Sequence, residues 1–145
     1  MNIGNHFFDT QQNTYVMGIL NVTPDSFSDG GKFNQLDSAL FQVEKLIDEG
    51  AHIIDVGGES TRPNHVMISV QEEIERVCPI IEAINRRFSI PISLDTYKSE
   101  VAEAGFIVGV HMINDIWGLK WDNRMAGVIA KYKGSCCIMH NRTEM

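Results

Sequence analysis

The sequence lacks most of the features that would commit it to a membrane, to export or to nucleic acid. No apolar run approaches the roughly 18 residues of a membrane-spanning helix, and no basic segment followed by an apolar one opens the chain. Basic residues are in deficit, because 12 lysines and arginines face 19 aspartates and glutamates. No basic cluster offers the phosphate contacts that nucleic acid requires. We therefore expect a cytoplasmic protein that binds neither a membrane nor nucleic acid and holds any anionic ligand with a few local groups.

Cysteine is also scarce, and its arrangement excludes the common metal and redox motifs. The three cysteines include no CxxC pair: Cys136 and Cys137 are adjacent in an apolar run, and Cys78 stands alone. Adjacent residues of a strand face opposite sides of a sheet. We therefore expect three reduced thiols within the core.

The composition fits one globular domain over residues 1–145, with 43% hydrophobic and 21% charged residues. Five short apolar runs are typical of buried strands. They occupy residues 15–20, 52–56, 90–94, 110–113 and 135–139. The first fourteen residues are polar and aperiodic except for Phe7 and Phe8, which we expect to cover one end of the core.

Helical periodicity fills the intervals between these runs. Apolar spacing predicts one helix over about residues 35–49 and another from Ser69, which begins a capping box, to about residue 87. A shorter third helix, capped by Thr96, is expected to be interrupted at Gly105, and a fourth follows Asp122. The alternation of strands and helices predicts right-handed crossovers and one parallel sheet.

The kind of parallel fold is indicated by where the polar residues fall. They follow the strands, most clearly in the stretch 17–31, and the candidates at strand ends are Asn21, Asp55, Thr61, Asp95, Asn114 and Asp115. Because parallel strands end at one edge of the sheet, we expect these groups to converge. The first strand is not followed by the GxGxxG of dinucleotide-binding sheets. We therefore predict a partial TIM (β/α)8 barrel, made of the first five parallel strands and four helices.

Four blocks of the sequence resemble the pterin-binding signature of bacterial dihydropteroate synthase. They are MGILNVTPDSFSDGG at 17–31, IIDVGGESTRP at 53–63, ISLDT at 92–96 and IND at 113–115, in the family's order and spacing. The first two are long and specific, whereas the last two alone would be weak. The resemblance runs from about Tyr15 to Arg142 but covers only the first five strands of the family's eight.

The resemblance implies a transferase of folate biosynthesis. Such an enzyme condenses 4-aminobenzoate with 6-hydroxymethyl-7,8-dihydropterin diphosphate and releases pyrophosphate. The pterin can spread positive charge as the leaving group departs. An enzyme therefore gains most by holding the pterin rigidly and neutralising the diphosphate.

The resemblance also implies roles for particular strand-end residues. Asn21 matches the asparagine linked to Mg²⁺, a hard cation that prefers oxygen ligands, although an asparagine here can also satisfy turn amides. Asp95 and Asn114 match the catalytic and substrate-binding pair that contacts the pterin, with helix capping as the other reading of Asp95. Met139 matches the apolar wall of the pterin site or simply fills a gap in the core.

The two long loops match the family's loops around the diphosphate and the aminobenzoate. Thr61 and Arg62 are expected at the diphosphate. Phe27, Ser28 and Asp29 of the first loop, with Pro63 of the second, are expected to form mobile loops that complete the site. Four other residues near the strands are interpreted as structural: Asp55, which we expect to fix the loops, Asp115, His111 and His140.

Three readings remain open from the sequence. The family places an aspartate, a lysine, an arginine and a histidine after strands six to eight, and a chain of five strands cannot supply them. We therefore expect the 145 residues alone to be inactive, as a fragment of a synthase whose full-length form is a homodimer. The alternatives are a non-catalytic remnant that at most binds pterin, and another pterin-binding barrel such as a methyltetrahydrofolate-binding methyltransferase.

Overall fold

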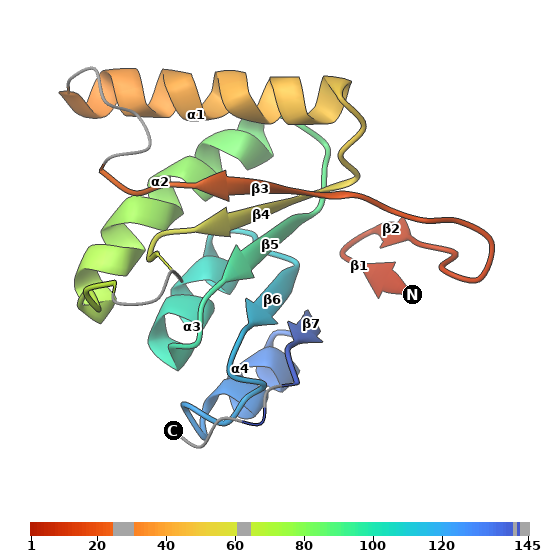
Figure 1. Ribbon diagram of the computed structural model, residues 1–145, viewed down its shortest axis with the longest axis vertical. Helices are drawn as coiled ribbons and strands as arrows, with labels where there is room; N and C mark the ends of the chain where they lie inside the picture. Colours follow the sequence, from red (N-terminus) through yellow and green to blue (C-terminus); the bar gives the residue numbers. More distant parts are fainter. Residues whose placement is uncertain (25–30, 61–64, 141, 143–145) are drawn as a thin grey trace.

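The computed structural model describes residues 1–24, 31–60, 65–140 and 142, with side chains described from residue 35 within the first helix. The elements in chain order are β1 (Asn2–Ile3), β2 (His6–Phe7), β3 (Met17–Asn21), α1 (Gly31–Asp48), β4 (Ile53–Gly57), α2 (Val70–Arg87), β5 (Ile92–Asp95), α3 (Ser99–Ile107), β6 (Met112–Asp115), α4 (Met125–Lys131) and β7 (Ser135–Ile138). Figure 1 shows the helices gathered beside a sheet whose central strands run in one direction.

One five-stranded parallel sheet in the order β3-β4-β5-β6-β7 organises the chain. Each strand pairs with the next strand in sequence, and a helix lies between them in the chain. Sequential parallel pairing with a helix in every crossover is the arrangement of a (β/α)8 barrel. The prediction of a partial barrel with five parallel strands and four helices is therefore confirmed.

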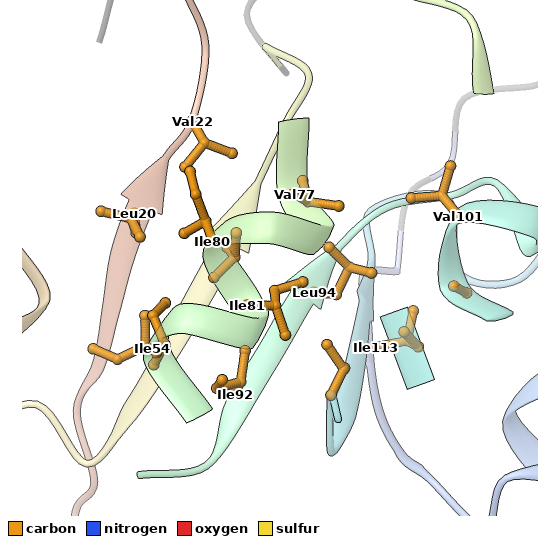
Figure 2. Packing of buried hydrophobic residues seen from close by; sticks show 14 of the residues in the cluster. Leu20, Val22, Ile54, Val77, Ile80, Ile81, Ile92, Leu94, Val101 and Ile113 are labelled. Atoms are coloured by element: carbon orange, nitrogen blue, oxygen red, sulfur yellow. The ribbon is translucent and has the colours of Figure 1, made fainter. Parts of the chain in front are cut away.

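The main core lies between the sheet and the helices. Leu20, Val56, Leu94 and Ile113, one from each of β3 to β6, are almost fully buried. Figure 2 shows Ile80 and Ile81 of α2 among the side chains of the strands. The apolar stripe along α2 explains this packing, since residues three and four apart share one face of a helix. In the described part of the chain, no helix combines the length and the apolar character needed to cross a membrane.

A short antiparallel hairpin, β1–β2, closes the end of the sheet from which the strands start (Figure 1). Ile3 and Phe8 pack there against Ile53 and Met112 in a second buried cluster. Phe8 is 4% exposed, which confirms that it covers one end of the core, but Phe7 is 71% exposed and the expectation for it was wrong. Two neighbouring residues of a strand face opposite sides, so only one of them can reach the core.

The third helix continues through Gly105, where the sequence predicted an interruption. A Cβ built on Gly105 would lie 2.4 Å from Leu94 Cδ2, so only glycine lets α3 approach the sheet this closely. The cap of this helix also differs from the prediction. Thr96 Oγ1 accepts from Lys98 N, whereas the first helical amide, Ser99 N, donates to Asp122 Oδ2 at 3.0 Å.

Asp122 therefore caps α3, although it lies 23 residues after Ser99 in the sequence, and it also accepts a hydrogen bond near the start of α4. Its Oδ1 accepts from Arg124 N at 3.0 Å, just before the helix begins at Met125. Burial opposes the charge of Asp122, but the hydrogen bonds from Arg124 and Ser99 outweigh it and hold the pKa of this carboxyl well below its usual range.

The expectation that the three cysteines lie within the core was wrong. All three lie in the described part of the chain and are free thiols, but Cys136 and Cys137 are exposed and Cys78 is only half-buried. Both exposed cysteines lie on β7, which among the described residues pairs only with β6 and lies at an edge of the sheet. A strand at the edge lacks a neighbour on one side, and its side chains are covered less.

Candidate functional site

Polar residues from three strands lie in one row across the sheet, next to the ends of the strands. Asn21 pairs with Gly57, Gly57 with Asp95, and Asp95 with Asn114. Neighbouring strands are roughly 4.8 Å apart, so the side chains of one row are near neighbours. The structure thus brings together three residues that are up to 93 positions apart in sequence, from 21 to 114.

This row faces away from the helices. The residues that precede Asn21, Asp95 and Asn114 in their strands, Leu20, Leu94 and Ile113, all lie in the helix-side core. Successive side chains of a strand point to opposite faces. Asn21, Asp95 and Asn114 therefore lie on the open face, where Asn21 is exposed and the other two are partly exposed.

A glycine keeps space free between two of these side chains. A Cβ built on Gly57 would lie 3.5 Å from Asp95 Cβ, 3.6 Å from Asp95 Oδ2 and 3.8 Å from Asn21 Oδ1. These are ordinary contact distances, so a side chain here would occupy the gap between the carboxylate and the amide. Gly57 thus leaves the position between Asp95 Oδ2 and Asn21 Oδ1 free of a side chain of its own.

Below this row lies a buried polar layer with unused hydrogen-bonding capacity. Asn114 Nδ2 donates to Asp55 Oδ2 at 3.1 Å. Within the described residues, neither Asp55 Oδ1 nor the Ser93 hydroxyl has a hydrogen-bond partner of normal length. Buried polar atoms are almost always paired, so such atoms indicate a position for a water or a ligand. Asp55 thus orients the Asn114 amide, and the expectation that it also fixes the loops stays a prediction.

Burial and neighbouring negative charges raise the pKa values of the carboxyl groups on this face. Burial is the main cause that raises the pKa of Asp95 to about 7, and the charges of Asp55, Glu73, Asp115 and Glu59 add to it. Burial likewise raises the pKa of Asp55, against smaller opposing effects of Ser93 and Asn114. Asp95 can therefore carry or release a proton near neutral pH, and a ligand with a positive or donating edge would stabilise its ionised form.

Asp115 acts as an anchor, as the sequence suggested. It is fully buried, and its two carboxylate oxygens accept from Trp117 N at 2.8 Å and Leu119 N at 3.0 Å. Its backbone oxygen also accepts from Met139 N at 3.1 Å. Met139 is thereby tied to the same edge of the sheet, with its side chain 54% exposed.

Six predicted residues lie outside the described part of the chain. Phe27, Ser28 and Asp29 fall within residues 25–30, and Thr61, Arg62 and Pro63 fall within residues 61–64. Their expected places at the diphosphate and in the mobile loops stay predictions.

A buried ionic cluster next to the row was missed from the sequence. Lys98 Nζ donates to Glu59 Oε2 and to Glu73 Oε2, each at 2.6 Å, and the Tyr97 hydroxyl donates to Glu59. One signal could have revealed it: Glu73 lies four residues before Val77 on the apolar stripe of α2. A charged residue on a buried stripe requires a partner of opposite charge.

The charges of this cluster are coupled. Burial alone would lower the pKa of Lys98, but its bonds to Glu59 and Glu73 outweigh burial and raise it. Burial opposes the charge of Glu59 as well, yet the bonds from Lys98 and Tyr97 lower its pKa overall. The ammonium and the Glu59 carboxylate are thus both charged at neutral pH.

The described residues contain no metal site built from protein side chains alone, because no three His, Cys, Asp or Glu side chains among them are grouped to hold an ion. The oxygens around Gly57 offer a different arrangement. Asn21 Oδ1 supplies one hard ligand beside an open position. Mg²⁺ keeps several waters and is commonly bound through one or two protein oxygens and substrate phosphates, so these residues fit it in that mode.

Comparison with known proteins gives the family. Residues 17–145 match the family described as pterin binding enzyme. The dihydropteroate synthase of Clostridium beijerinckii is 59% identical over 142 residues, which are 98% of this chain and 53% of that protein.

Solved structures agree with this comparison. Dihydropteroate synthase from Clostridium difficile, crystallised with pteroic acid, superposes with a TM-score of 0.91 at 54% identity, covering 96% of this chain and 53% of that one. The Xanthomonas albilineans enzyme with 4-aminobenzoic acid gives a TM-score of 0.82 at 41% identity, covering 88% and 46%. The chain thus spans about half the length of the relatives it matches. On the family match, the sequence identity and the shared fold, this chain belongs to the family of pterin binding enzymes.

Proposed function

We propose that the chain provides the pterin-binding face of a dihydropteroate synthase, which condenses 4-aminobenzoate with 6-hydroxymethyl-7,8-dihydropterin diphosphate and releases pyrophosphate. The observation that carries the proposal is the row of Asn21, Asp95 and Asn114 on the open face of the sheet. The similarity to synthases crystallised with pteroic acid and with 4-aminobenzoic acid supports the choice of substrates.

Asp95 and Asn114 suit the edge of a pterin ring. A carboxylate accepts hydrogen bonds from the ring's adjacent N–H groups, and an amide offers one donor and one acceptor. Asp55 accepts from the Asn114 Nδ2 group and so leaves the Asn114 oxygen available to a ligand. The second oxygen of Asp55 and the Ser93 hydroxyl, which make no hydrogen bond of normal length among the described residues, supply further groups beneath the ring. Met139 supplies apolar contact at the same edge.

The diphosphate is assigned to the other end of the row. Asn21 would hold Mg²⁺, and the ion would supply positive charge that stabilises the leaving diphosphate. Thr61 and Arg62 are proposed to bind the same group. Phe27, Ser28 and Asp29 are proposed to complete the aminobenzoate site, and Pro63 is proposed to shape the second loop.

The chemistry explains why such a site would suffice for binding but not for turnover. Departure of the diphosphate leaves positive charge spread over the pterin, next to the ionised Asp95, and fixed charges at such a site stabilise the transition state. The family's groups after later strands are not among these 145 residues. We therefore expect the chain to bind the pterin substrate without forming dihydropteroate at a measurable rate.

Isothermal titration of the purified chain with the pterin diphosphate, with and without Mg²⁺, tests the proposal. Binding should strengthen with Mg²⁺ in the wild type, lose this Mg²⁺ dependence in Asn21→Ala, and weaken at least tenfold in Asp95→Asn. Asn85→Ala is the matched control, because Asn85 bonds the backbone oxygens of Val108 and Gly109 at the opposite end of the sheet. Equal binding by all four proteins would refute the assignment of the row.

A further inference from the structure

The polar row continues onto one more strand, where its fifth member is a cysteine. β7 pairs with β6 in parallel, and Cys137 is the partner of Asn114 in the register. Neighbouring strands lie roughly 4.8 Å apart, and partners in parallel strands point to the same face of the sheet. Cys137 therefore lies beside Asn114 on the open face, at the opposite end of the row from Asn21.

Two contacts hold β7 in this register. The Ser135 hydroxyl donates to the backbone oxygen of Asn2 in the terminal hairpin at 2.8 Å. Met139 N donates to the backbone oxygen of Asp115 at 3.1 Å. A slip by one residue would turn the side chain of Cys137 to the other face. Attachment on both sides of Cys137 therefore keeps its thiol next to the assigned place of the pterin ring.

The neighbouring Cys136 provides a natural comparison. Both cysteines are exposed, so a reagent can reach both in the folded chain. Cys136 pairs with Ile113, which belongs to the helix-side core, and so it faces away from the row. The third thiol, Cys78, is half-buried, and burial, followed by the charge of Glu82, raises its pKa and slows its reactions.

The face that carries Cys137 also holds buried polar atoms suited to a ligand. Asp55 and Ser93 pair with each other in the row beneath, and they are only 3% and 0% exposed. Neither Asp55 Oδ1 nor the Ser93 hydroxyl makes a hydrogen bond of normal length among the described residues. The other oxygen of Asp55 accepts from Asn114, the neighbour of Cys137. Cys137 thus borders a position that a ligand would complete.

We propose that Cys137 is a modification site within the pterin site: a small disulfide that reacts with its thiol attaches a group where the pterin ring binds, so that modification and pterin binding exclude each other. The inference rests on the proposed function, in which the ring lies on Asp95 and Asn114. The free thiol is small and offers the ring an apolar contact. A group attached to its sulfur projects from the same face as the Asn114 amide and competes with the ring for that space.

The reaction is a thiol–disulfide exchange. The thiolate of Cys137 attacks one sulfur of the reagent, a new S–S bond forms, and the S–S bond of the reagent breaks. The departing thiolate takes up the proton that the cysteine lost, so the disulfide itself is the oxidant. A thiol reductant reverses the exchange. Small disulfides should therefore block pterin binding by this chain, and reduction should restore it.

Two single variants separate the exposed thiols. Cys136→Ser keeps Cys137, and Cys137→Ser keeps Cys136. Each is treated with hydroxyethyl disulfide, which is uncharged, and peptide mass spectrometry follows the addition with and without pterin diphosphate and Mg²⁺. With the ligand at about ten times its Kd, roughly one site in eleven is free, so addition to Cys137 should slow about tenfold. Addition to Cys136 should keep its rate.

The second measurement is binding after modification. Calorimetric titration of the fully modified Cys136→Ser chain should show the affinity for pterin diphosphate weakened by at least about tenfold, and dithiothreitol should restore it. Modified Cys137→Ser should bind as the same variant does before treatment. Circular dichroism should show that both modified chains are folded, because the modified thiols are exposed.

The outcomes are distinct. Protection of Cys137 alone, together with a reversible loss of affinity, supports the inference. Equal rates with and without ligand, equal protection of Cys136, unfolding on modification, or full affinity of the modified Cys136→Ser chain overturns it and leaves the proposed function in place. An unmodified chain that binds no pterin diphosphate overturns the proposed function as well.

Discussion

The two faces of the sheet are built from alternate residues of the same strands, yet they differ in almost every physical respect. On the helix side, Leu20, Val56, Leu94 and Ile113 are packed against α1 to α3 with little or no exposure. On the open side, the neighbouring residues are Asn21, Asp95 and Asn114, and beneath them lie Asp55 Oδ1 and the Ser93 hydroxyl, which make no hydrogen bond of normal length among the described residues.

The two faces contribute to different properties of the chain, the helix side to stability and the open side to ligand binding. Burial of the helix side contributes to stability roughly in proportion to apolar area. The open side contributes little in that way, and its clustered carboxylates oppose folding above neutral pH. Changes on the helix side should therefore act on stability, and changes on the open side should act on ligand binding.

The largest effect on stability is expected from Leu94→Ala. Leu94 is fully buried, and its Cδ2 lies 2.4 Å from the position that a Cβ on Gly105 would take, so the truncation opens a cavity between β5 and α3. Loss of a buried leucine costs about 2 to 5 kcal/mol of the free energy of unfolding. Urea unfolding measures it, and a loss below about 1 kcal/mol would mean that this face is not the main source of stability.

Adjacent glycines give a matched test of the two faces. A Cβ on Gly58 would lie 2.8 Å from Val77 Cγ1, whereas one on Gly57 meets only ordinary contacts near Asp95 and Asn21. Gly58→Ala should destabilise the chain by about 1 to 3 kcal/mol through overpacking. Gly57→Ala should change stability by less than about 1 kcal/mol.

The ligand response of this pair should be reversed. Gly57→Ala fills the position between the Asn21 amide and the Asp95 carboxylate, so it should reduce the gain in pterin diphosphate affinity that we expect from Mg²⁺. Gly58→Ala should retain that gain at temperatures where circular dichroism shows a folded chain. The distinction between the two faces is refuted if Gly57→Ala and Gly58→Ala both lose stability, or if both lose the Mg²⁺-dependent gain in affinity.

Asp95→Asn should stabilise the folded chain at pH 8. The pKa of Asp95 is raised from 3.8 to about 7, so between these values the folded chain holds a proton that the unfolded chain has released. The free energy of unfolding contributed by this group therefore falls as the pH rises through this window. We expect a gain of about 1 to 3 kcal/mol at pH 8.

This gain should decrease toward pH 4, where the aspartate is protonated in the folded state, and it should accompany the loss of pterin affinity. Urea unfolding at several pH values follows it. A destabilised variant at pH 8 would show that Asp95 supports the fold.

The smallest effect concerns His111, at the end of the sheet where the strands start. Its Nδ1 accepts from Ile92 N at 3.0 Å, and burial, followed by the charge of His6, lowers its pKa. The unfolded chain therefore binds more protons below pH 6.5, and stability is lost as the pH falls through that value. In His111→Gln, the decrease in the free energy of unfolding from pH 8 to pH 5 should be smaller by up to about 1 kcal/mol, as measured by urea unfolding across this range. A free energy of unfolding that depends on pH as in the wild type would contradict this account.

Much of the fold could be predicted because the helix side obeys local rules. The spacing of Val70, Val77, Ile81 and Ile84 marks α2, and the order of strands and helices determines a parallel sheet. The row of Asn21, Asp95 and Asn114 follows from the same rule, since parallel strands end at one edge. Periodicity therefore gives both the core and the placement of the polar groups.

Other features depend on contacts between residues distant in sequence. Gly105 lies within α3 and against Leu94, and Cys136 is exposed on β7, at an edge of the described sheet. The bond from Lys98 to Glu59 joins residues 39 positions apart. No local pattern contains such partners, so these features required the assembled structure.

The side-chain amides of the two asparagines give the most direct test of the central claim. In the 16.3 kDa chain, nuclear magnetic resonance can follow the side-chain NH2 signals of ¹⁵N-labelled asparagines as pterin diphosphate and Mg²⁺ are added. We expect the signals of Asn21 and Asn114 to shift together, while that of Asn85 stays in place. Shifts elsewhere in the chain with Asn21 and Asn114 unmoved would show that the ligand binds away from this row.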